Sequence, residues 1–282
     1  MSTDLQGTVL ITGCSDGGAG SAMAAEFQAR GYRVFATSRN VKTMSRVESL
    51  SNVRLLQLDI TKPDEIRAAV EAVREETGGT LTYLVNCAAR NHFMPLLDED
   101  IEAAKSLFDL NVWGQLATTQ AFAPLLKQAK GTVVFITSLS GYLNVPYQGV
   151  FAASKRSAEI MAETLRLELA PFHVKVFSVV TGALKTNGQT HFEDWKLPEG
   201  SLYTPVEETI HMRARGQEGA PRMEAADYAK RVVAEIIKGR SGKFWYGASA
   251  GAVQFGTSYL PQWMMVSRRH FLFPDHRKLT VC

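Results

Sequence analysis

The stretch TVLITGCSDGGAG, residues 8–20, places a short apolar run directly before a glycine-rich turn, and an alanine-rich segment with helical spacing follows it. Glycines let the backbone turn tightly and approach a pyrophosphate closely. The free amides and the dipole of the following helix attract the negative charge of that group. The stretch therefore predicts a strand, turn and helix that bind a dinucleotide. A tight turn without a ligand is the alternative for a glycine loop taken alone.

The rest of the chain alternates short apolar runs with amphipathic stretches, which is the pattern of β-α-β units in a parallel sheet. The expected strands are 8–12, 33–37, 53–58, 83–88, 132–138, 174–180 and 243–248. The expected helices are 20–31, 63–78, 99–128, 154–172 and 225–239, with Pro63 and Gly78 as start and stop signals. We expect an α/β fold: a Rossmann-type, doubly wound parallel sheet of about seven strands flanked by helices, as a single domain over residues 1–282.

Two segments depart from this pattern. Residues 183–222 lose the periodicity and follow the sixth strand, beyond whose carboxyl end ligands bind in such sheets, so we expect a substrate lid there. A mobile loop without a ligand is the alternative. Residues 250–282 form a C-terminal extension, in which 259–273 mixes aromatic and apolar residues with Arg268 and Arg269. We expect this part to cover the core or the substrate pocket, with weak association with a membrane surface as the alternative.

Composition excludes several classes of protein. The net charge of +3 is small for 282 residues and Lys and Arg are scattered among Asp and Glu, so nucleic acid is not an expected partner. Cys14, Cys87 and Cys282 form no C-x-x-C pair, which indicates a reducing compartment. The six histidines show no metal-ligand spacing, and no metal is expected. Without a signal peptide or a long apolar run, the chain is expected to be soluble and cytoplasmic, with no stable membrane span.

The residues at the end of the second expected strand indicate which dinucleotide is bound. An NAD site usually has a carboxylate there for the ribose 2′-hydroxyl, whereas a 2′-phosphate requires a cation. This chain has Thr37, Ser38 and Arg39. We expect NADP(H), with Arg39 donating paired N–H groups to the phosphate and Ser38 adding a hydroxyl. The alternative is that Arg39 is an ordinary surface arginine.

These motifs resemble those of the short-chain dehydrogenase/reductase family over nearly the whole chain. The family motif TGxxxGxG is matched with one extra glycine, and that form resembles a fungal branch similar to NADPH-dependent 1-acyldihydroxyacetone-phosphate reductases, which implies fungal secondary or lipid metabolism. The motif "NCAA" (86–89) stands where the family has NNAG, and Thr181-Gly182 stands where it has Pro-Gly. The resemblance implies that Asp59 holds the adenine ring and that Thr186 contacts the nicotinamide carboxamide. The expected cofactor-binding residues are Gly13, Ser15, Gly18, Ala19, Ser38, Arg39, Asp59, Ile60, Asn86, Lys155, Gly182 and Thr186.

The family catalyses with an Asn, Ser, Tyr, Lys tetrad, and the resemblance carries three of these residues onto Asn111, Ser138 and Lys155. The tyrosine position is Phe151. Residues 151 and 155 are four positions apart and share one helix face, as the tyrosine and lysine of the family do. Position 151 therefore aligns with the family's tyrosine. In the family, the tyrosine protonates the developing alkoxide while the serine hydrogen-bonds the carbonyl oxygen. A positioned general acid contributes roughly 100- to 10,000-fold in rate, so we expect slow reduction at most.

We therefore expect an NADPH-dependent reductase scaffold for a carbonyl on a fairly large apolar small molecule. Its family resemblance implies a homodimer or homotetramer. The apolar preference rests on aromatic residues of the lid and tail, which are Phe192, Trp195, Tyr203, Trp263 and Phe271. The expected substrate-pocket residues are Tyr142, Tyr147, His92 and Trp195. For His92 and His191, a solvated surface position is the favoured reading.

Three explanations of Phe151 stay open. An engineered Tyr to Phe replacement would silence the acid while preserving the shape of the site. Alternatively, the protein is a non-redox isomerase or cyclase with NADP(H) as a structural cofactor, or an inactive NADP(H)-binding protein. In the third explanation another group donates the proton, and Tyr142 and Tyr147 are the candidates because both lie in the loop before Phe151. The intact Asn111, Ser138 and Lys155 favour the first.

Overall fold

The computed structural model describes residues 5–261, without the side chains of residues 189 and 190. Its main sheet has the strand order β3-β2-β1-β4-β5-β6-β9, and every neighbouring pair is parallel. The strands are β1 Thr8–Ile11, β2 Arg33–Ser38, β3 Val53–Gln57, β4 Tyr83–Asn86, β5 Thr132–Ser138, β6 Lys175–Thr181 and β9 Gly242–Tyr246. The predicted doubly wound parallel sheet is confirmed, including its seventh strand.

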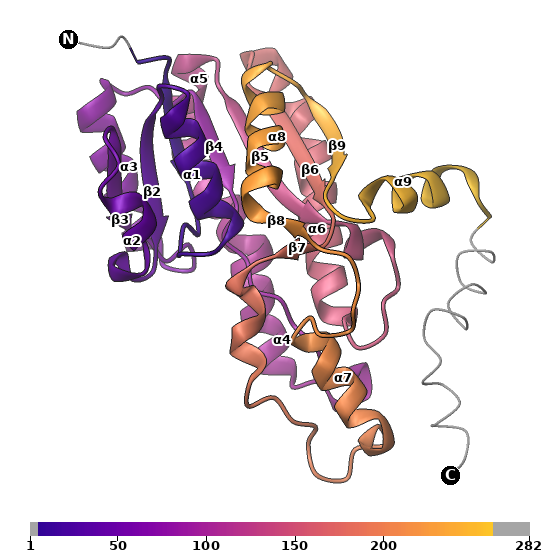
Figure 1. Cartoon of the computed structure of the whole chain (residues 1–282). Coiled ribbons are helices and arrows are strands. Elements are labelled where there is room, and N and C mark those ends of the chain that lie inside the picture. The colour runs from indigo at the N-terminus through magenta and orange to yellow at the C-terminus, as the bar shows by residue number, and fades with distance from the viewer. Residues whose placement is uncertain (1–4, 262–282) are drawn as a thin grey trace.

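Helices cover both faces of the sheet (Figure 1). One face carries α1 Ala19–Ala29, α2 Ser45–Glu48 and α8 Ala225–Ile237, and the other carries α3 Pro63–Thr77, α5 Gln115–Ala129 and α6 Gly149–Glu168. Because side chains alternate along a strand, Val9 and Ile11 face α1 while Leu10 faces α3, and all three are fully buried. Two-sided burial explains why these strands are continuously apolar.

The helix expected over 99–128 is observed as one helical run from Ile101 to Ala129, with a feature that was not predicted. α4 Ile101–Phe108 passes into a π-helical turn, η3 Asp109–Gly114, before α5 begins. Gly114 lies so close to the next layer that a Cβ there would be 2.8 Å from the carbonyl oxygen of Ile60. The π-helical turn therefore lies against the loop after β3, and Asn111, which belongs to this turn, is fully buried. π-turns of this kind are frequent at functional sites.

The other helix limits follow the sequence signals. Pro63 begins α3, and Gly78, with a φ of 66°, ends it in the left-handed region that favours glycine. α6 begins at Gly149, before the expected start at 154, and therefore includes both Phe151 and Lys155. The short 3-10 helices are η1 Val41–Thr43, η2 Leu96–Asp98, η4 Leu139–Tyr142 and η5 Ala170–Phe172.

The expected lid, 183–222, has more structure than its broken periodicity predicts. It contains β7 Leu184–Lys185, η6 Asn187–Phe192, η7 Thr204–Val206 and α7 Glu207–Ala214, and β7 pairs with β8 Met223–Glu224. Its apolar residues Phe192, Val206 and Ile210 pack against Phe93 and Tyr147 from two distant loops. The segment is therefore a small packed layer, beside α4 in Figure 1, at the end of the sheet where the site lies.

The C-terminal extension begins with α9 Ala250–Tyr259. The rest of the extension, including Trp263, Arg268, Arg269 and Phe271, lies outside the described residues. Within residues 5–261, no helix combines the length and the apolar character needed to cross a bilayer.

Candidate functional site

The glycine-rich turn after β1 is held by close backbone packing. Gly13 has a φ of 76°, and a Cβ there would lie 2.8 Å from the Cα of Ala88. A Cβ on Gly20 would lie 2.4 Å from the carbonyl oxygen of Gly13. The N-cap Gly18 offers no side chain to the first amides of α1, which begins at Ala19. The loop therefore leaves helix amides unpaired beside a backbone surface that an anionic group can approach.

The turn after β2 is fixed by hydroxyl contacts. Ser38 Oγ donates to the Asn40 carbonyl (2.7 Å) and lies 3.0 Å from Thr43 Oγ1, while Ser15 Oγ lies 2.9 Å from the same Thr43 oxygen. Arg39, next to Ser38, is exposed, and its guanidinium forms no ion pair with another residue in the described part of the chain. Arg39 directly follows β2, and a cation at this position suits a ribose 2′-phosphate better than a 2′-hydroxyl.

The loop after β3 brings Asp59 to the same edge. Asp59 Oδ1 accepts hydrogen bonds from the Thr61 amide (3.0 Å) and hydroxyl (2.7 Å). Partial burial opposes ionisation of this carboxyl, but the Thr61 hydrogen bonds and the charges of Arg39 and Lys62 outweigh it and lower the pKa of Asp59. Ile60 beside it is buried in the core. Asp59 is thus a fixed acceptor at this edge of the sheet.

Asn86 and Gly182 have clear packing roles. The side chain of Asn86 is fully buried and donates from Nδ2 to Thr119 Oγ1 (2.9 Å), so it joins β4 to α5. Gly182 follows β6, where a Cβ would lie 2.2 Å from the carbonyl oxygen of Ala248. Only glycine allows the chain after β6 to pass so close to the chain after β9.

Asn111 links three segments of the site. Its Oδ1 accepts from the Arg90 amide (2.9 Å), and its Nδ2 donates to the Arg90 carbonyl (3.0 Å) and to Ser154 Oγ (3.1 Å). Ser154 Oγ in turn donates to the Phe151 carbonyl (2.7 Å). The fully buried asparagine therefore connects the loop after β4, through the π-helical turn, to the first turns of α6.

Lys155 attaches α6 to the strand beside it. Its Nζ donates to the carbonyl of Ile136 (3.0 Å) on β5, two positions before Ser138. Burial lowers the pKa of Lys155 to about 8, against an opposing effect of the neighbouring Cys87. Burial raises the pKa of the Cys87 thiol to about 11, and the charge of Lys155 opposes this. The lysine is a buried cation that loses its proton more readily than an exposed one.

Phe151 occupies the first turn of α6 and is 9% exposed. Ser138 ends β5 and accepts a hydrogen bond at Oγ from the Ser140 amide (3.1 Å), so its hydroxyl proton is free to point elsewhere. These hydrogen bonds and the packing of β5 against α6 bring Asn111, Ser138, Phe151 and Lys155 to the same end of the sheet. A hydroxyl group and a buried cation therefore lie at the same end of the sheet as the Phe151 ring, which has no proton to donate.

Residues 183–222, the expected lid, contact the glycine turn and the loop after β4. Asn187, the first residue of η6, donates from Nδ2 to the Asp16 carbonyl (3.1 Å), and Thr186 caps the N-terminus of η6. Trp195 Nε1 donates to the Phe93 carbonyl (2.6 Å). Tyr147, only 8% exposed, packs edge-on to Tyr203 at 6.0 Å. Trp195 and Tyr147 therefore belong to the apolar interior of the lid.

The two histidines near residues 183–222 differ in exposure, because His92 is half-buried whereas His191 is exposed, as a surface position requires. His92 Nε2 lies 2.8 and 2.9 Å from the two carboxyl oxygens of the nearly buried Glu99. The His191 ring packs on Phe192 at 4.1 Å, and burial lowers its pKa, despite a hydrogen bond to Asn91 that raises it. No three His, Cys, Asp or Glu side chains within residues 5–261 gather as metal ligands would.

Tyr142 lies in a separate polar cluster between α6 and β9. Its ring centroid is 4.6 Å from that of Trp245 and 4.5 Å from the Arg156 guanidinium. Burial, followed by the charge of Glu159, raises the pKa of Tyr142. The buried Glu159 accepts from Thr137 and Ser178 at 2.9 and 2.6 Å. These contacts give Tyr142 a packing role and make it a poorer acid than a free tyrosine.

Sequence reasoning missed several residues that shape the site. Ser154 directly precedes Lys155, but nothing in the sequence indicates that it accepts a hydrogen bond from Asn111. Asn187 and Gln115 act by contacts with distant backbone, because Gln115 Nε2 donates to the Ala88 carbonyl (3.1 Å). No local sequence signal identifies such contacts.

Comparison with known proteins gives one consistent result. Residues 7–197 match the short chain dehydrogenase family. The chain is 42% identical over 257 residues to the short-chain dehydrogenase ptmH of Penicillium ochrochloron, covering 91% of this chain and 94% of that protein. It is 38% identical over 206 residues to the NADPH-dependent 1-acyldihydroxyacetone phosphate reductase of Schizosaccharomyces pombe, covering 72% and 69%.

Solved structures show the same fold. A short-chain dehydrogenase from Streptomyces avermitilis superposes with a TM-score of 0.77 at 25% identity, covering 96% of this chain and all of that one. A short chain dehydrogenase from Burkholderia cenocepacia in complex with NADP superposes with a TM-score of 0.75 at 24% identity, covering 93% and 97%.

The lowered pKa of Lys155 predicts a pH dependence of stability. Between about pH 8 and 10.5 the unfolded chain binds a proton at Lys155 that the folded chain does not, so stability should rise with pH in this range. We expect the free energy of unfolding of the unaltered chain, minus that of Lys155→Met, to grow from pH 8 to pH 10 by at most ~1.4 kcal/mol per pH unit in urea titrations without cofactor. A difference that stays constant with pH would show that the Lys155 pKa is not lowered.

Proposed function

We propose that this chain, which belongs to the short-chain dehydrogenase family, is an NADP(H)-dependent reductase scaffold for a carbonyl on a fairly large apolar substrate, in which Phe151 replaces the proton donor. The observation that carries the proposal is the bonded set around α6. Lys155 bonds this helix to β5, and Asn111 bonds it through Ser154 to the π-helical turn, while the side chain at 151 has no proton to give.

The cofactor follows from the glycine turn and the end of β2. The amides of α1 would hold the pyrophosphate, and Arg39 beside Ser38 would hold the 2′-phosphate. Asp59 would accept a hydrogen bond from the adenine ring, and Thr186 would contact the carboxamide. The Schizosaccharomyces pombe relative is named as NADPH-dependent, which supports the same choice here.

Ser138, Lys155 and Phe151 decide how well this site could reduce a carbonyl group. NADPH, when bound, supplies a hydride to the carbonyl carbon, and the carbonyl oxygen then needs one proton. Ser138, whose Oγ accepts from the Ser140 amide, would donate a hydrogen bond to that oxygen, and the Lys155 cation would lower the energy of negative charge near it. Phe151 fills the space of a tyrosine but cannot transfer a proton, so protonation is left to water and reduction is slow.

The lid supports an apolar substrate. Its interior is formed by Phe93, Tyr147, Phe192 and Ile210, with Trp195 packed against them. Such a surface favours a large apolar molecule that loses its hydration on binding. We assign residues 183–222 as the substrate lid and residues 250–282 as a C-terminal extension of the same domain.

Restoring the acid tests the proposal. Phe151→Tyr should raise the rate of NADPH oxidation with a panel of lipophilic ketones by roughly 100- to 10,000-fold, because it returns a positioned proton donor. Phe151→Leu, which changes the same side chain without adding a hydroxyl, should give no gain. A non-redox isomerase, a cyclase or an inactive binding protein would replace our proposal if Phe151→Tyr stayed inert, most directly if the unaltered chain converted a substrate without consuming NADPH.

Arg39 should set cofactor choice. We expect Arg39→Ala to weaken NADPH binding by roughly 10- to 100-fold in a fluorescence titration, because a charge-assisted bond to the 2′-phosphate is lost. NADH binding should hardly change, and Arg74→Ala, which removes an exposed arginine on α3, serves as the control. Tighter binding of NADH than of NADPH by the unaltered chain would remove the role assigned to Arg39.

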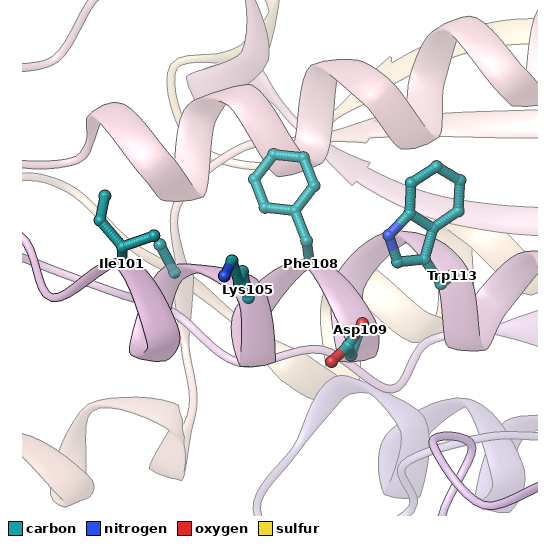
Figure 2. Close-up of a pocket in the computed structure, with 6 residues that line it drawn as sticks. Ile101, Lys105, Phe108, Asp109 and Trp113 are labelled. Carbon is teal, nitrogen blue, oxygen red and sulfur yellow. The ribbon is translucent and has the colours of Figure 1, made fainter.

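We extend the proposal to a homodimer or homotetramer. Ile101 and Trp113 are 63% and 54% exposed, and they line a surface cavity of about 450 Å³ with Phe108. Figure 2 shows these three side chains projecting to one side of the α4 and η3 segment. On α6, Ile160 and Leu167 are 54% and 65% exposed. Large apolar side chains gathered on adjacent helices suit a subunit contact.

A charge in this surface should separate the subunits. Ile160→Asp is expected to lower the mass measured by sedimentation equilibrium toward that of a single chain, because burying an unpaired carboxylate is unfavourable. Leu202→Asp, at a 74% exposed position in the lid, should leave the mass unchanged. A monomeric unaltered chain would contradict the assignment, as would an Ile160→Asp variant of unchanged mass.

A further inference from the structure

Asp16, in the glycine-rich turn, bonds to the segment that follows β2. Its backbone amide donates to the Thr43 carbonyl (2.7 Å). Its carboxylate accepts from the Ser45 amide (3.0 Å), the Ser45 hydroxyl (2.7 Å) and the Arg46 amide (3.0 Å). One residue of the turn therefore makes four hydrogen bonds to the end of η1 and the start of α2.

The Asp16 carboxyl is held in its charged form. Partial burial opposes its ionisation, but the hydrogen bonds from Ser45 and Arg46 and the charge of the Arg46 side chain outweigh burial and lower the pKa of Asp16. Hydrogen bonds to an ionised acceptor are stronger than those between neutral groups. The Asp16 carboxylate is therefore a strong polar connection between the glycine turn and the start of α2.

The segment that Asp16 holds carries Arg39 on a compact turn. The hydroxyls of Ser38 and Thr43 both donate to the Asn40 carbonyl, each at 2.7 Å. Met44, which follows this turn, is fully buried in the core. Arg39 itself is exposed. Because the turn is closed by its own hydrogen bonds, fixing its end at Thr43 also fixes where Arg39 lies relative to the glycine turn.

These two segments would hold two parts of one cofactor. The first amides of α1 are the proposed pyrophosphate site, and Arg39 is the proposed 2′-phosphate site. NADPH would use both sites, whereas NADH has no 2′-phosphate and would use only the first. A second contact on the same ligand adds affinity when its site is already at the right distance from the first. The spacing of the two segments therefore matters for NADPH and hardly for NADH.

We infer that Asp16 is a positioning residue for cofactor selection, whose carboxylate fixes the spacing between the glycine turn and Arg39 and so favours NADPH over NADH. The inference rests on the NADP(H) site proposed above. Both carboxylate oxygens accept hydrogen bonds from Ser45 or Arg46, so the role assigned to Asp16 is to hold the backbone and not to touch the cofactor. A carboxylate that faced the 2′-phosphate would repel it.

Fluorescence titrations of NADPH and NADH into the full chain test the inference. Asp16→Ala should weaken NADPH binding by roughly 5- to 20-fold and change NADH binding by less than about twofold, because only NADPH uses the spacing. Ser45→Ala, which removes the hydroxyl bond but keeps the charge and the glycine turn, should weaken NADPH binding by roughly two- to fivefold. Asp64→Asn, which removes a carboxylate charge from an exposed position on α3, should leave both affinities unchanged.

Combination with Arg39→Ala separates positioning from a general structural role. Once Arg39 is replaced, Asp16→Ala should cause no further loss of NADPH binding, because the two residues act on one contact. An equal loss with and without Arg39, or an equal loss for both cofactors, would show that Asp16 merely stabilises the turn. Tighter NADPH binding by Asp16→Ala would show instead that the carboxylate repels the 2′-phosphate, and either result overturns the inference.

The same titrations distinguish this inference from the cofactor proposal on which it rests. If Arg39→Ala leaves NADPH binding unchanged, the proposed 2′-phosphate site is wrong. If Arg39→Ala weakens NADPH binding but Asp16→Ala and Ser45→Ala do not, the site stands and only the role of Asp16 is wrong. Ser45→Ala carries the test alone if circular dichroism shows that Asp16→Ala does not fold.

Discussion

The hydrogen bond from the buried Lys155 ammonium to the Ile136 carbonyl, 3.0 Å long, joins the first turns of α6 to the strand that ends at Ser138. Asn111 holds the same helix from the other side through Ser154. Burying an ammonium group is costly unless it is hydrogen-bonded, so this helix position is strongly determined. The side chain at position 151 is consequently presented to the site whether or not it carries a hydroxyl.

This constraint allows a phenylalanine at position 151 without a change in the shape of the site. Phe151 is 9% exposed and occupies the volume that a tyrosine ring would fill. The groups that would bind the adenosine and pyrophosphate parts of the cofactor lie on the glycine turn, at the end of β2 and in the loop after β3, and their hydrogen bonds do not involve residue 151. The loss is local because the bonds around α6 involve the backbone and Ser154 rather than the ring at 151.

The strands and the register of the site were predictable from sequence because they depend on local patterns. Buried parallel strands are continuously apolar, and residues 151 and 155 must share a face once they lie on one helix. The π-helical turn at Asp109–Gly114 was not predictable, since it depends on the approach of Gly114 to the Ile60 carbonyl. The packed interior of the lid was missed for the same reason, because Phe192 finds its partners Phe93 and Tyr147 in distant loops. Tyr142 looked like a pocket residue because it precedes Phe151 closely, yet its neighbours come from β9.

The proposed loss of a proton donor at position 151 requires that the chain still binds NADP(H). Isothermal titration calorimetry of NADPH into the unaltered chain and into Phe151→Tyr tests it most directly, because binding is measured without any turnover. We expect saturable binding by both forms with dissociation constants that agree within about threefold, since a single hydroxyl at 151 is not needed to hold the cofactor. Failure of the unaltered chain to bind NADPH, with binding restored by Phe151→Tyr, would contradict it.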